Sequence, residues 1–312
     1  MSPDATFPRA LNASTRLCAV LGSPVRHSAS PAMHNAALAA LGLNWCYLGC
    51  EVNPDRLREA IEGARHLGFV GLNLTVPHKQ LAMALMDELD ESAREWGAVN
   101  TVVFGRRDDS GEWHPVGQRS DLDGPVLARG HNTDADAIIR AINEDLGIEP
   151  RSARVLLLGA GGAGRAAALR LAAEGVGCLY LVNRTQVRAE ELAAEIGDRY
   201  PAVEVHVGYP EGDVEIVLNA TSLGLKSGDA SPLDSSRFSL GQADGVYDMI
   251  YRPASTPLLD QARAAGCRTA NGLGMLLYQG AAALELWSGR QVPVEIMRAA
   301  LHREIYGAGG AR

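Results

Sequence analysis

One glycine-rich segment, GAGGAG at residues 159–164, constrains the fold of this chain more than any other feature, because it fits the pattern G-x-G-x-x-G. An apolar strand pattern at 154–158 precedes it, and a helical pattern rich in alanine, leucine and glutamate follows it. In such a strand–turn–helix unit, the first glycine permits a tight turn and the second lets the backbone approach a pyrophosphate. The third permits close helix–strand packing, and the helix N-terminus points amide N–H groups at the phosphates. The segment therefore predicts a dinucleotide-binding domain; the alternative is a structural glycine turn in an α/β layer that binds no ligand.

The end of the next predicted strand, 178–182, indicates which dinucleotide is bound. NAD-selective domains usually place an Asp or Glu at that point, which accepts a hydrogen bond from the ribose 2′-hydroxyl. This chain has Asn183, Arg184 and Thr185 there, followed by Arg188, and no acidic residue among them. Guanidinium groups and a hydroxyl suit a 2′-phosphate, which arginine binds through paired hydrogen bonds. The sequence therefore favours NADP over NAD, although Arg188 by itself is also typical of a solvated helix position.

The rest of the chain alternates strand and helix patterns, which is typical of an α/β architecture. In the first third we expect strands at 16–22, 47–52, 69–76 and 98–104, and helices from 31, at 56–67 and at 81–96. Residues 105–130 change to a charged, glycine-rich composition, which we interpret as a surface excursion or a hairpin. A second α/β block begins near Thr133, with further strands at 203–207, 216–219 and 245–248 and a largely helical end at 275–306. At about 150 residues per domain, the 312 residues predict two domains.

Composition excludes several classes of protein. The net charge of −8 argues against a chain that holds nucleic acid by charge over its whole surface. The longest uncharged apolar stretch, 155–164, is far shorter than the roughly 20 residues of a membrane-spanning helix. The first residues lack the apolar core of a signal peptide, so we expect a cytoplasmic protein. The five cysteines are scattered and are expected to be buried reduced thiols, with no metal site.

Polar side chains stand in four segments of the first block where apolar packing or a plain strand end is expected: Ser28 and Ser30, Thr75 and Lys79, Asn100, and Asp134. Polar groups at the carboxyl ends of strands in α/β sheets tend to line clefts, and an asparagine inside an apolar strand must find hydrogen-bond partners. The alternatives are a helix N-cap for a serine or for the aspartate, and a solvated strand end for the lysine.

Together with the glycine segment, these segments resemble the shikimate dehydrogenase family from about Leu21 to Leu286. The matching motifs occur in the family's order: HSASP (27–31), NLTVPHK (73–79), GAVNT (97–101), NTD (132–134), GAGGAGRA (159–166), NRTQVRA (183–189), NATSLG (219–224), YDMIY (247–251), TPLL (256–259) and GLGMLLYQGA (272–281). Several of these motifs are individually distinctive, so chance agreement is negligible.

The resemblance implies roles for particular residues. It implies that the catalytic pair is Lys79 and Asp134. It implies that the ring hydroxyls and carboxylate of shikimate are held by Ser28, Ser30, Thr75, Asn100, Asp134, Tyr251 and Gln279. It implies that NADP(H) is bound by Gly159, Ala160, Gly161, Gly162, Ala163, Asn183, Arg184, Thr185, Arg188, Met249 and Gly272, and more loosely by Glu91.

The resemblance also implies the domain organisation. We expect an N-terminal α/β substrate domain at 1–133, a Rossmann-type NADP domain at 134–274, and C-terminal helices at 275–312 that return to the substrate domain. Gln279, which would join substrate residues of the first block, agrees with that return. Both monomers and homodimers fit this fold.

The implied activity is the NADPH-dependent, reversible reduction of 3-dehydroshikimate to shikimate. Reduction of a ketone needs a hydride and a proton on the new alkoxide; a lysine ammonium can donate that proton and stabilise the developing charge. Rival activities within the family are those of quinate/shikimate and amino-shikimate dehydrogenases, and Ser30 and Arg184 favour shikimate with NADP. A nucleotide-sensing regulator of the same fold is the rival from another class, and it would need neither Lys79 nor Asp134.

The chain departs from the family pattern at a few positions. Ala135 replaces a glycine that is common after NTD, His78 stands where an aromatic residue is frequent, and Arg252 follows the tyrosine where a smaller polar residue is usual. The segment 106–129 is long for this loop. None of these departures removes a chemical group that the reaction needs, but the long segment could shape a cleft rim or an interface.

Overall fold

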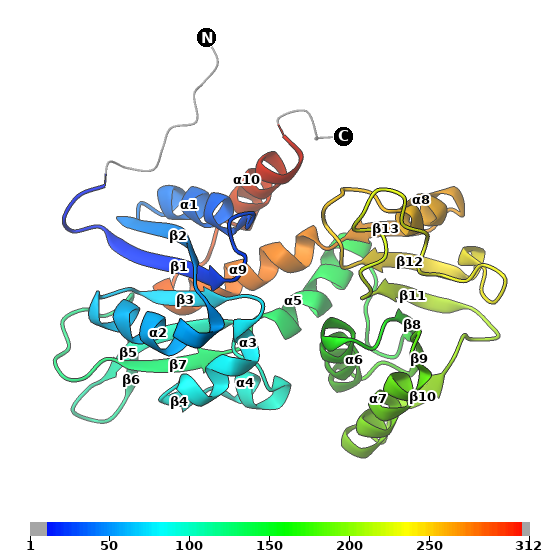
Figure 1. Cartoon of the computed structure of the whole chain (residues 1–312), viewed down its shortest axis with the longest axis horizontal. Helices are drawn as coiled ribbons and strands as arrows, with labels where there is room; N and C mark the ends of the chain where they lie inside the picture. Colours follow the sequence, from blue (N-terminus) through cyan, green and yellow to red (C-terminus); the bar gives the residue numbers. More distant parts are fainter. Residues whose placement is uncertain (1–10, 308–312) are drawn as a thin grey trace, which may run out of the picture. The chain divides into compact units, whose positions relative to one another are not determined.

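The computed structural model describes residues 11–307, so residues 1–10 and 308–312 of the expected substrate domain lie outside the described part, as does most of the segment judged above for a signal peptide. The chain divides into two compact units (Figure 1): Met1–Asp134 with Leu277–Arg312, and Ala135–Leu276. Each unit is built around its own sheet.

The first unit contains a seven-stranded mixed sheet in the order β2-β1-β3-β5-β7-β4, with β6 paired to β5. Its strands are β1 (Arg16–Gly22), β2 (Trp45–Glu51), β3 (Gly71–Leu74), β4 (Glu88–Leu89), β5 (Thr101–Arg107), β6 (Trp113–Pro115) and β7 (Leu127–His131). Strand β1 is parallel to β2 and β3, whereas β5 is antiparallel to β3, β6 and β7. The ends of β1, β3 and β7 and the start of β5 therefore lie at one edge of the sheet.

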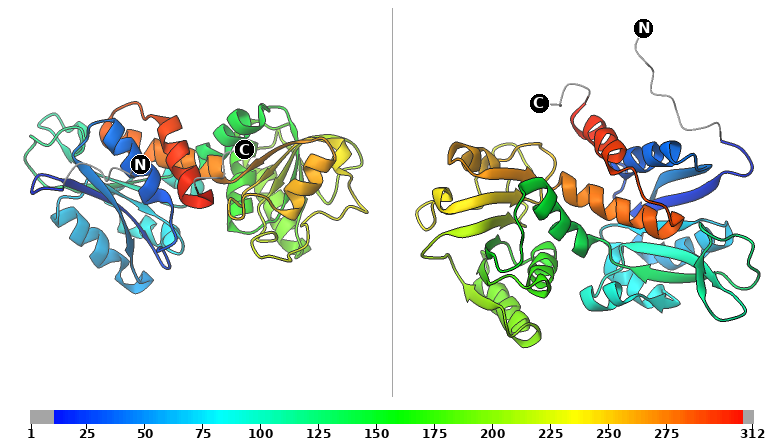
Figure 2. Two further views of the ribbon diagram at one scale, coloured as in Figure 1. Left: turned by 90° about the horizontal axis from the view of Figure 1, so that it is seen from above. Right: turned by 180° about the vertical axis from the view of Figure 1, so that it is seen from behind.

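Helices cover both faces of this sheet. They are α1 (Ser30–Ala40), α2 (Leu57–His66), α3 (His78–Leu81), α4 (Glu91–Trp96), α10 (Val294–Tyr306) and the part of α9 (Leu273–Ser288) from Leu277 onward, with 3₁₀ turns at Pro54–Arg56 and Ala82–Leu85. Helix α2 packs its buried residues Leu57 and Ile61 on one face, while α1 and α10 lie on the other (Figure 2). The return of the C-terminal helices to the first unit is thus present in the structure.

The single helix expected at 81–96 is wrong. The structure has a 3₁₀ turn, an extended Met86, the short strand β4 and the separate helix α4. Asp90 starts α4 as an N-cap, because its side chain accepts a hydrogen bond from the Ser92 amide at 3.0 Å. Pairing of β4 with β7 supplies hydrogen bonds that a continuous helix would have forgone, so tertiary pairing overrides the local helical pattern.

The second unit is a doubly wound α/β fold. Its six strands are all parallel, in the order β10-β9-β8-β11-β12-β13. They are β8 (Arg154–Leu158), β9 (Cys178–Val182), β10 (Glu204–Val207), β11 (Val214–Asn219), β12 (Ala243–Asp248) and β13 (Arg268–Asn271). The helices are α5 (Asp134–Ala141), whose first residue still belongs to the first unit, α6 (Gly162–Glu174), α7 (Gln186–Arg199) and α8 (Pro257–Ala264). A short π-helix at Ile142–Leu146 and a 3₁₀ turn at Leu240–Gln242 complete the unit.

Counted from β8, this strand order is the 3-2-1-4-5-6 order of dinucleotide-binding domains. The expected α/β class with a Rossmann-type domain is therefore confirmed. Strand β13 was not expected, since its half-exposed sequence RTAN has no apolar run. Among residues 11–307, no helix is both long enough and apolar enough to cross a membrane.

Candidate active site and nucleotide site

Lys79 and Asp134, which lie 55 residues apart in the sequence, form an ion pair in the first unit. The Lys79 Nζ lies 2.7 Å from Asp134 Oδ2, and their side chains are 32% and 20% exposed. Lys79 belongs to α3, just after β3, and Asp134 follows β7. The lysine is therefore not merely a solvated strand end: both groups reach the same sheet edge and remain accessible from solvent.

The start of β5 brings Asn100 to the same edge, where both the Nδ2 and the Oδ1 of its amide form hydrogen bonds. Its Nδ2 donates to Thr133 Oγ1 at 2.9 Å, and its Oδ1 accepts from the Thr133 amide at 2.7 Å and from Thr101 Oγ1 at 3.1 Å. Thr133 Oγ1 in turn donates to the carbonyl of Gln279 at 3.0 Å. This network joins the segment before Asp134 to helix α9, and so places Gln279 beside residues of the first block.

A buried tyrosine extends the network under the sheet edge. The Tyr47 hydroxyl donates to Asn73 Oδ1 at 2.8 Å, and Asn73 Nδ2 donates to Thr101 Oγ1 at 3.0 Å. Burial raises the pKa of Tyr47 well above its ordinary value, while a hydrogen bond with Ser30 opposes that rise. The hydroxyl therefore stays protonated and fixed, and Ser30 is linked through it to the residues around Asn100.

Ser28 and Thr75 follow the ends of β1 and β3. The Ser30 amide donates to Ser28 Oγ at 3.3 Å, yet the N-cap residue of α1 is Ala29, which has no side-chain cap. The N-cap alternative therefore does not explain both serines. Thr75 lies against Gly22, where an added Cβ would come within 2.4 Å of Thr75 Cγ2. Glycine at the end of β1 is thus what lets this threonine lie at the edge.

Four buried residues of this unit were not predicted as site residues: Tyr47, Asn73, Thr101 and Thr133. Each is at most 7% exposed and hydrogen bonded to another polar side chain. Asn73, Thr101 and Thr133 stand inside the motifs quoted above, so a polar residue at a buried strand position was the available signal. They touch the site through Asn100, and their role is to position it.

The glycine segment of the second unit forms the turn between β8 and α6. Gly159 has φ +105°, a conformation that favours glycine, and a Cβ on Gly164 would lie 1.9 Å from the Gly159 carbonyl oxygen. By contrast, a Cβ on Gly161 or Gly162 would meet nothing within 4 Å. The outer two glycines are therefore required by the fold, and the middle two leave the backbone open to an approaching phosphate.

The segment after β9 lies beside this turn. Asn183 Oδ1 accepts a hydrogen bond from the Ala160 amide at 3.0 Å, and its Nδ2 donates to the Thr185 carbonyl at 2.8 Å. Arg184, Thr185 and Arg188 are exposed, and within residues 11–307 neither arginine forms an ion pair. Both guanidinium groups are thus available to an anionic ligand that enters over the glycine turn.

The remaining predicted residues fall in both units. Met249 and Gly272 lie together in the second unit, because a Cβ on Gly272 would come within 2.1 Å of the Met249 carbonyl oxygen. Tyr251 follows Met249 in the same unit, whereas Glu91 is an exposed residue at the start of α4 in the first unit. Within each unit, the predicted residues gather at the end of the sheet where the parallel strands have their carboxyl ends. Glu91 is among them, because it follows β4, which is parallel to β7.

Buried polar residues also fix the strand ends beside Met249. Asp248 accepts hydrogen bonds from Asn219 Nδ2 at 2.9 Å and from Thr256 Oγ1 at 2.6 Å, and all three residues are at most 1% exposed. Burial raises the pKa of Asp248 above its ordinary value, and these hydrogen bonds oppose the rise. The motifs NATSLG, YDMIY and TPLL therefore meet through this carboxyl group, a role that was not predicted.

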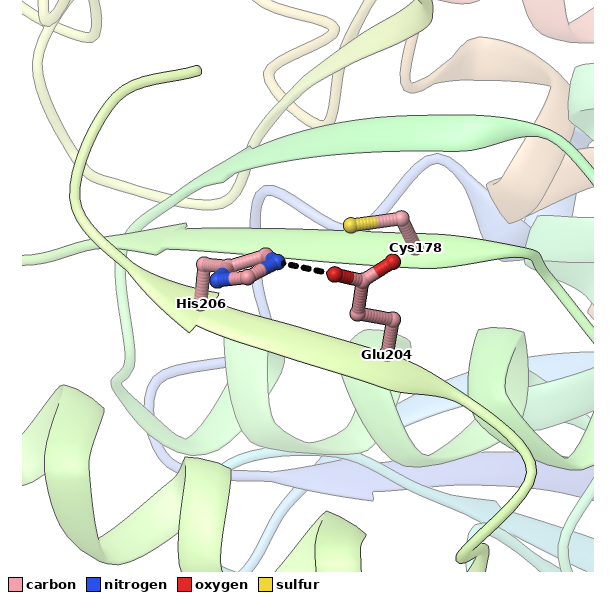
Figure 3. Close-up of side chains that lie close together, drawn as sticks. All are labelled: Cys178, Glu204 and His206. Carbon is pink, nitrogen blue, oxygen red and sulfur yellow. Dashed lines mark hydrogen bonds and ion pairs between the residues drawn. The ribbon is translucent and has the colours of Figure 1, made fainter. Parts of the chain in front are cut away.

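Three side chains of metal-ligating type lie together in the second unit, although no metal site was expected. Cys178, Glu204 and His206 bring one sulfur, one oxygen and one nitrogen within 4.8 Å of one another (Figure 3). His206 Nε2 lies 2.7 Å from Glu204 Oε1, so these two groups already satisfy each other. Cys178 and Glu204 begin β9 and β10, at the edge opposite the glycine turn, and the cluster has no part in the nucleotide site.

The fold, the Lys79–Asp134 pair and the glycine turn together define a class of protein. A doubly wound dinucleotide-binding unit, joined to a unit that carries an accessible lysine–aspartate pair, is the construction of a nucleotide-dependent dehydrogenase. Residues 20–102 match the shikimate dehydrogenase substrate binding domain, residues 142–222 the shikimate/quinate 5-dehydrogenase domain, and residues 272–302 the shikimate 5′-dehydrogenase C-terminal domain.

Individual proteins agree with these matches. The chain is 44% identical over 309 residues to a shikimate dehydrogenase (NADP(+)) of Moorella thermoacetica, with 96% of each chain covered. Its structure is similar to that of a shikimate dehydrogenase in complex with NADP+, with a TM-score of 0.80 and 34% identity over 96% of this chain and 99% of that chain. It is also similar to a 5-ketofructose reductase of Gluconobacter sp. strain CHM43, with a TM-score of 0.77 and 31% identity over 94% and 99% of the two chains. The chain belongs to the shikimate dehydrogenase family.

Proposed function

We propose that this protein catalyses the NADPH-dependent, reversible reduction of 3-dehydroshikimate to shikimate, a step of aromatic amino acid biosynthesis in the cytoplasm. The observation that carries the proposal is the Lys79–Asp134 pair at 2.7 Å, at a polar sheet edge of a chain from this family. A non-catalytic NADP sensor would need neither group. The substrate is a free small molecule, and the enzyme acts as a monomer or a homodimer.

In this proposal, one part of the chain binds the substrate and the other binds the cofactor. Residues 1–133 with 275–312 form the substrate domain, and residues 134–274 form the NADP domain. Shikimate is held through its hydroxyl and carboxylate groups by Ser28, Ser30, Thr75, Asn100, Asp134, Tyr251 and Gln279. Hydroxyl and amide groups suit such a polyol, because each can donate and accept hydrogen bonds.

In this proposal, Lys79 is the residue that donates the proton. NADPH, when bound, supplies a hydride to the substrate ketone. The Lys79 ammonium group donates a proton to the oxygen of that ketone, and its charge stabilises the alkoxide as it forms. Asp134, which accepts a hydrogen bond from Nζ, orients the ammonium group and offers its second oxygen to a substrate hydroxyl. In the direction of oxidation, the lysine takes the proton from the substrate hydroxyl as the hydride leaves for NADP+.

Cofactor binding falls to the second unit in this proposal. Gly159, Ala160, Gly161, Gly162 and Ala163 would contact the pyrophosphate, and Met249 and Gly272 the nicotinamide side. The adenosine side would be bound by Asn183, Arg184, Thr185 and Arg188, of which the two arginines would bind the 2′-phosphate. Glu91 would add a cofactor contact from the first unit. The open backbone at Gly161 and Gly162 supports this assignment, as do the two arginines, which form no ion pair in the part of the chain that the structure describes.

Replacing Arg184 by alanine is expected to raise the KM for NADPH by about tenfold or more, because one charge-assisted hydrogen bond to a phosphate is lost. The KM for NADH should change little, since NADH has no 2′-phosphate. Initial rates with both cofactors measure the difference. Arg199→Ala, which removes an arginine from the other end of α7, is the matched control. An equal change with NADPH and NADH would contradict the assignment of Arg184.

The substrate is tested by initial rates of oxidation with shikimate and quinate, each with NADP+ and NAD+. We expect the highest kcat/KM for shikimate with NADP+. A higher value for quinate would establish the rival activity within the family, and no turnover with nucleotide binding intact would establish the sensor. Because a 5-ketofructose reductase has a similar structure, reduction of 5-ketofructose by NADPH is a further arm of the assay.

A further inference from the structure

A cavity of about 520 Å³ lies in the first unit, away from the Lys79–Asp134 pair. It is lined by Arg16 at the start of β1, Arg106 near the end of β5, and the end of α2. Its outer wall comes from the segment 106–129, through Val116, Ser120, Pro125 and Val126. Because Lys79 follows β3, which is parallel to β1, the start of β1 lies at the opposite edge of the sheet. The cavity is therefore separate from the site described above.

Two of the three arginines that line this cavity, Arg16 and Arg106, donate hydrogen bonds to backbone carbonyls. Arg16 donates to the Val116 carbonyl at 2.7 Å, and Arg106 donates through Nε to the Gly124 carbonyl at 3.2 Å. Within residues 11–307, neither guanidinium forms an ion pair, although each has five N–H donors. Both side chains are half-buried, and burial lowers the pKa of Arg16, as does the positive charge of Arg106. Two like charges thus share one partly desolvated space.

Glu62 in the cavity lining, and Asp87 and Glu88 at β4, are already paired with arginines. Asp87 pairs with Arg65 at 2.6 Å, and Glu62, which lines the cavity, also pairs with Arg65. Glu88 pairs with both Arg107 and Arg129. In a chain of net charge −8, these arrangements leave Arg16 and Arg106 as an uncompensated positive pair. A half-buried pair of this kind is stabilised by an anion from solution.

Apolar side chains complete the lining. Phe69 and Val126 are half-buried hydrophobic residues, and Pro125 lies beside Val126 on the same wall. A pocket that combines apolar walls with a few convergent polar groups is the usual form of a small-molecule site, for which about 300–1,000 Å³ is typical. A bare inorganic ion would leave these apolar walls in contact with water, whereas an organic anion would cover them.

We propose that this cavity binds a small organic anion, whose carboxylate or phosphate lies between Arg16 and Arg106 and whose apolar body lies against Phe69, Pro125 and Val126. Guanidinium groups bind both kinds of head group through paired hydrogen bonds. The bound molecule would also tie the segment 106–129 to the start of β1. This gives that long segment a role which the reaction itself does not require.

The proposal is tested on the full chain by calorimetric titration with phenyl phosphate, benzoate and inorganic phosphate. NADP+ and shikimate are present in excess, so that anion-binding groups elsewhere are occupied. We expect phenyl phosphate or benzoate to bind, and inorganic phosphate to bind at least about tenfold more weakly than phenyl phosphate because it lacks the apolar body. Comparison of phenyl phosphate with benzoate identifies the preferred head group.

Arg106→Gln is expected to weaken binding of the better probe by about tenfold or more, since one charge-assisted contact is lost. Arg119→Gln is the matched control: Arg119 lies on the same segment and pairs with Asp121, so its loss should leave binding unchanged. Arg16→Lys keeps the positive charge but removes the paired N–H donors of the guanidinium group, and so tests the second arginine. No binding of either organic probe at about 10 mM, binding of inorganic phosphate as tight as that of the better organic probe, or undiminished binding by Arg106→Gln would overturn the proposal. These comparisons hold whether or not the chain turns over shikimate.

Discussion

Lys79→Ala is expected to lower kcat for shikimate oxidation by about 10²–10⁴-fold, the range that a positioned proton donor or acceptor contributes. The KM for shikimate should change by much less, because the hydroxyl and amide groups assigned to substrate binding are left in place. The chain contains only two lysines, Lys79 and Lys226, although it has 29 lysines and arginines together. Arginine cannot release a proton under ordinary conditions, so the use of lysine beside Asp134 fits a group that exchanges one.

Two further variants separate the proton from the charge. Lys79→Arg keeps a cation near Asp134 but cannot transfer a proton, so its kcat should also fall by about 10²-fold or more. Lys226→Ala removes the other lysine, which is exposed and lies in the second unit, and should leave kcat unchanged. Steady-state kinetics in the oxidative direction measure all three variants. Near-wild-type turnover by Lys79→Ala would remove this residue from the chemistry, and recovery by Lys79→Arg would reduce its role to electrostatics.

The features that could be predicted from the sequence are local in the chain. The turn at 159–164 follows from six consecutive residues between a strand and a helix, and the residues after β9 adjoin it directly through Asn183 and Ala160. Each such pattern has a physical requirement that no distant residue changes: Gly159 needs a positive φ, and Gly164 has no room for a side chain. The class of the second unit and its nucleotide site follow from these requirements.

The features that could not be predicted depend on residues far apart in the sequence. The expected helix at 81–96 is interrupted because β4 pairs with β7, which is contributed by a segment some forty residues later. The hydrogen bonds that fix Asn100 come from Thr133 and, through it, from the backbone of Gln279. A sequence shows that a buried asparagine needs partners, but it does not show which partners reach it. The pairing of Arg16 and Arg106 in one cavity has the same origin, since β1 and β5 are brought together only by the sheet.

Trp287→Ala is expected to lower the free energy of unfolding of the first unit by about 3–5 kcal/mol, the usual cost of removing a large buried aromatic side chain. Trp287 is fully buried, and its Nε1 donates to the Val102 carbonyl of β5 at 3.0 Å. Its ring lies against Gly71 of β3, where even a Cβ would come within 2.1 Å of Nε1. Truncation would therefore leave a large cavity and a buried carbonyl without its donor. Urea unfolding followed by far-ultraviolet circular dichroism measures the loss.

Two other tryptophan variants separate packing from hydrogen bonding. Trp287→Phe keeps most of the ring but loses the N–H group, so it should cost about 1–3 kcal/mol, the penalty of an unsatisfied buried acceptor. Trp113→Ala, at a half-buried position of β6 in the same unit, should cost less than Trp287→Ala. A loss below about 1 kcal/mol for Trp287→Ala would contradict this account. Gln279 and Trp287 lie on one helix, α9. The helix that Trp287 fastens to β5 therefore also carries the carbonyl that accepts a hydrogen bond from the hydroxyl of Thr133.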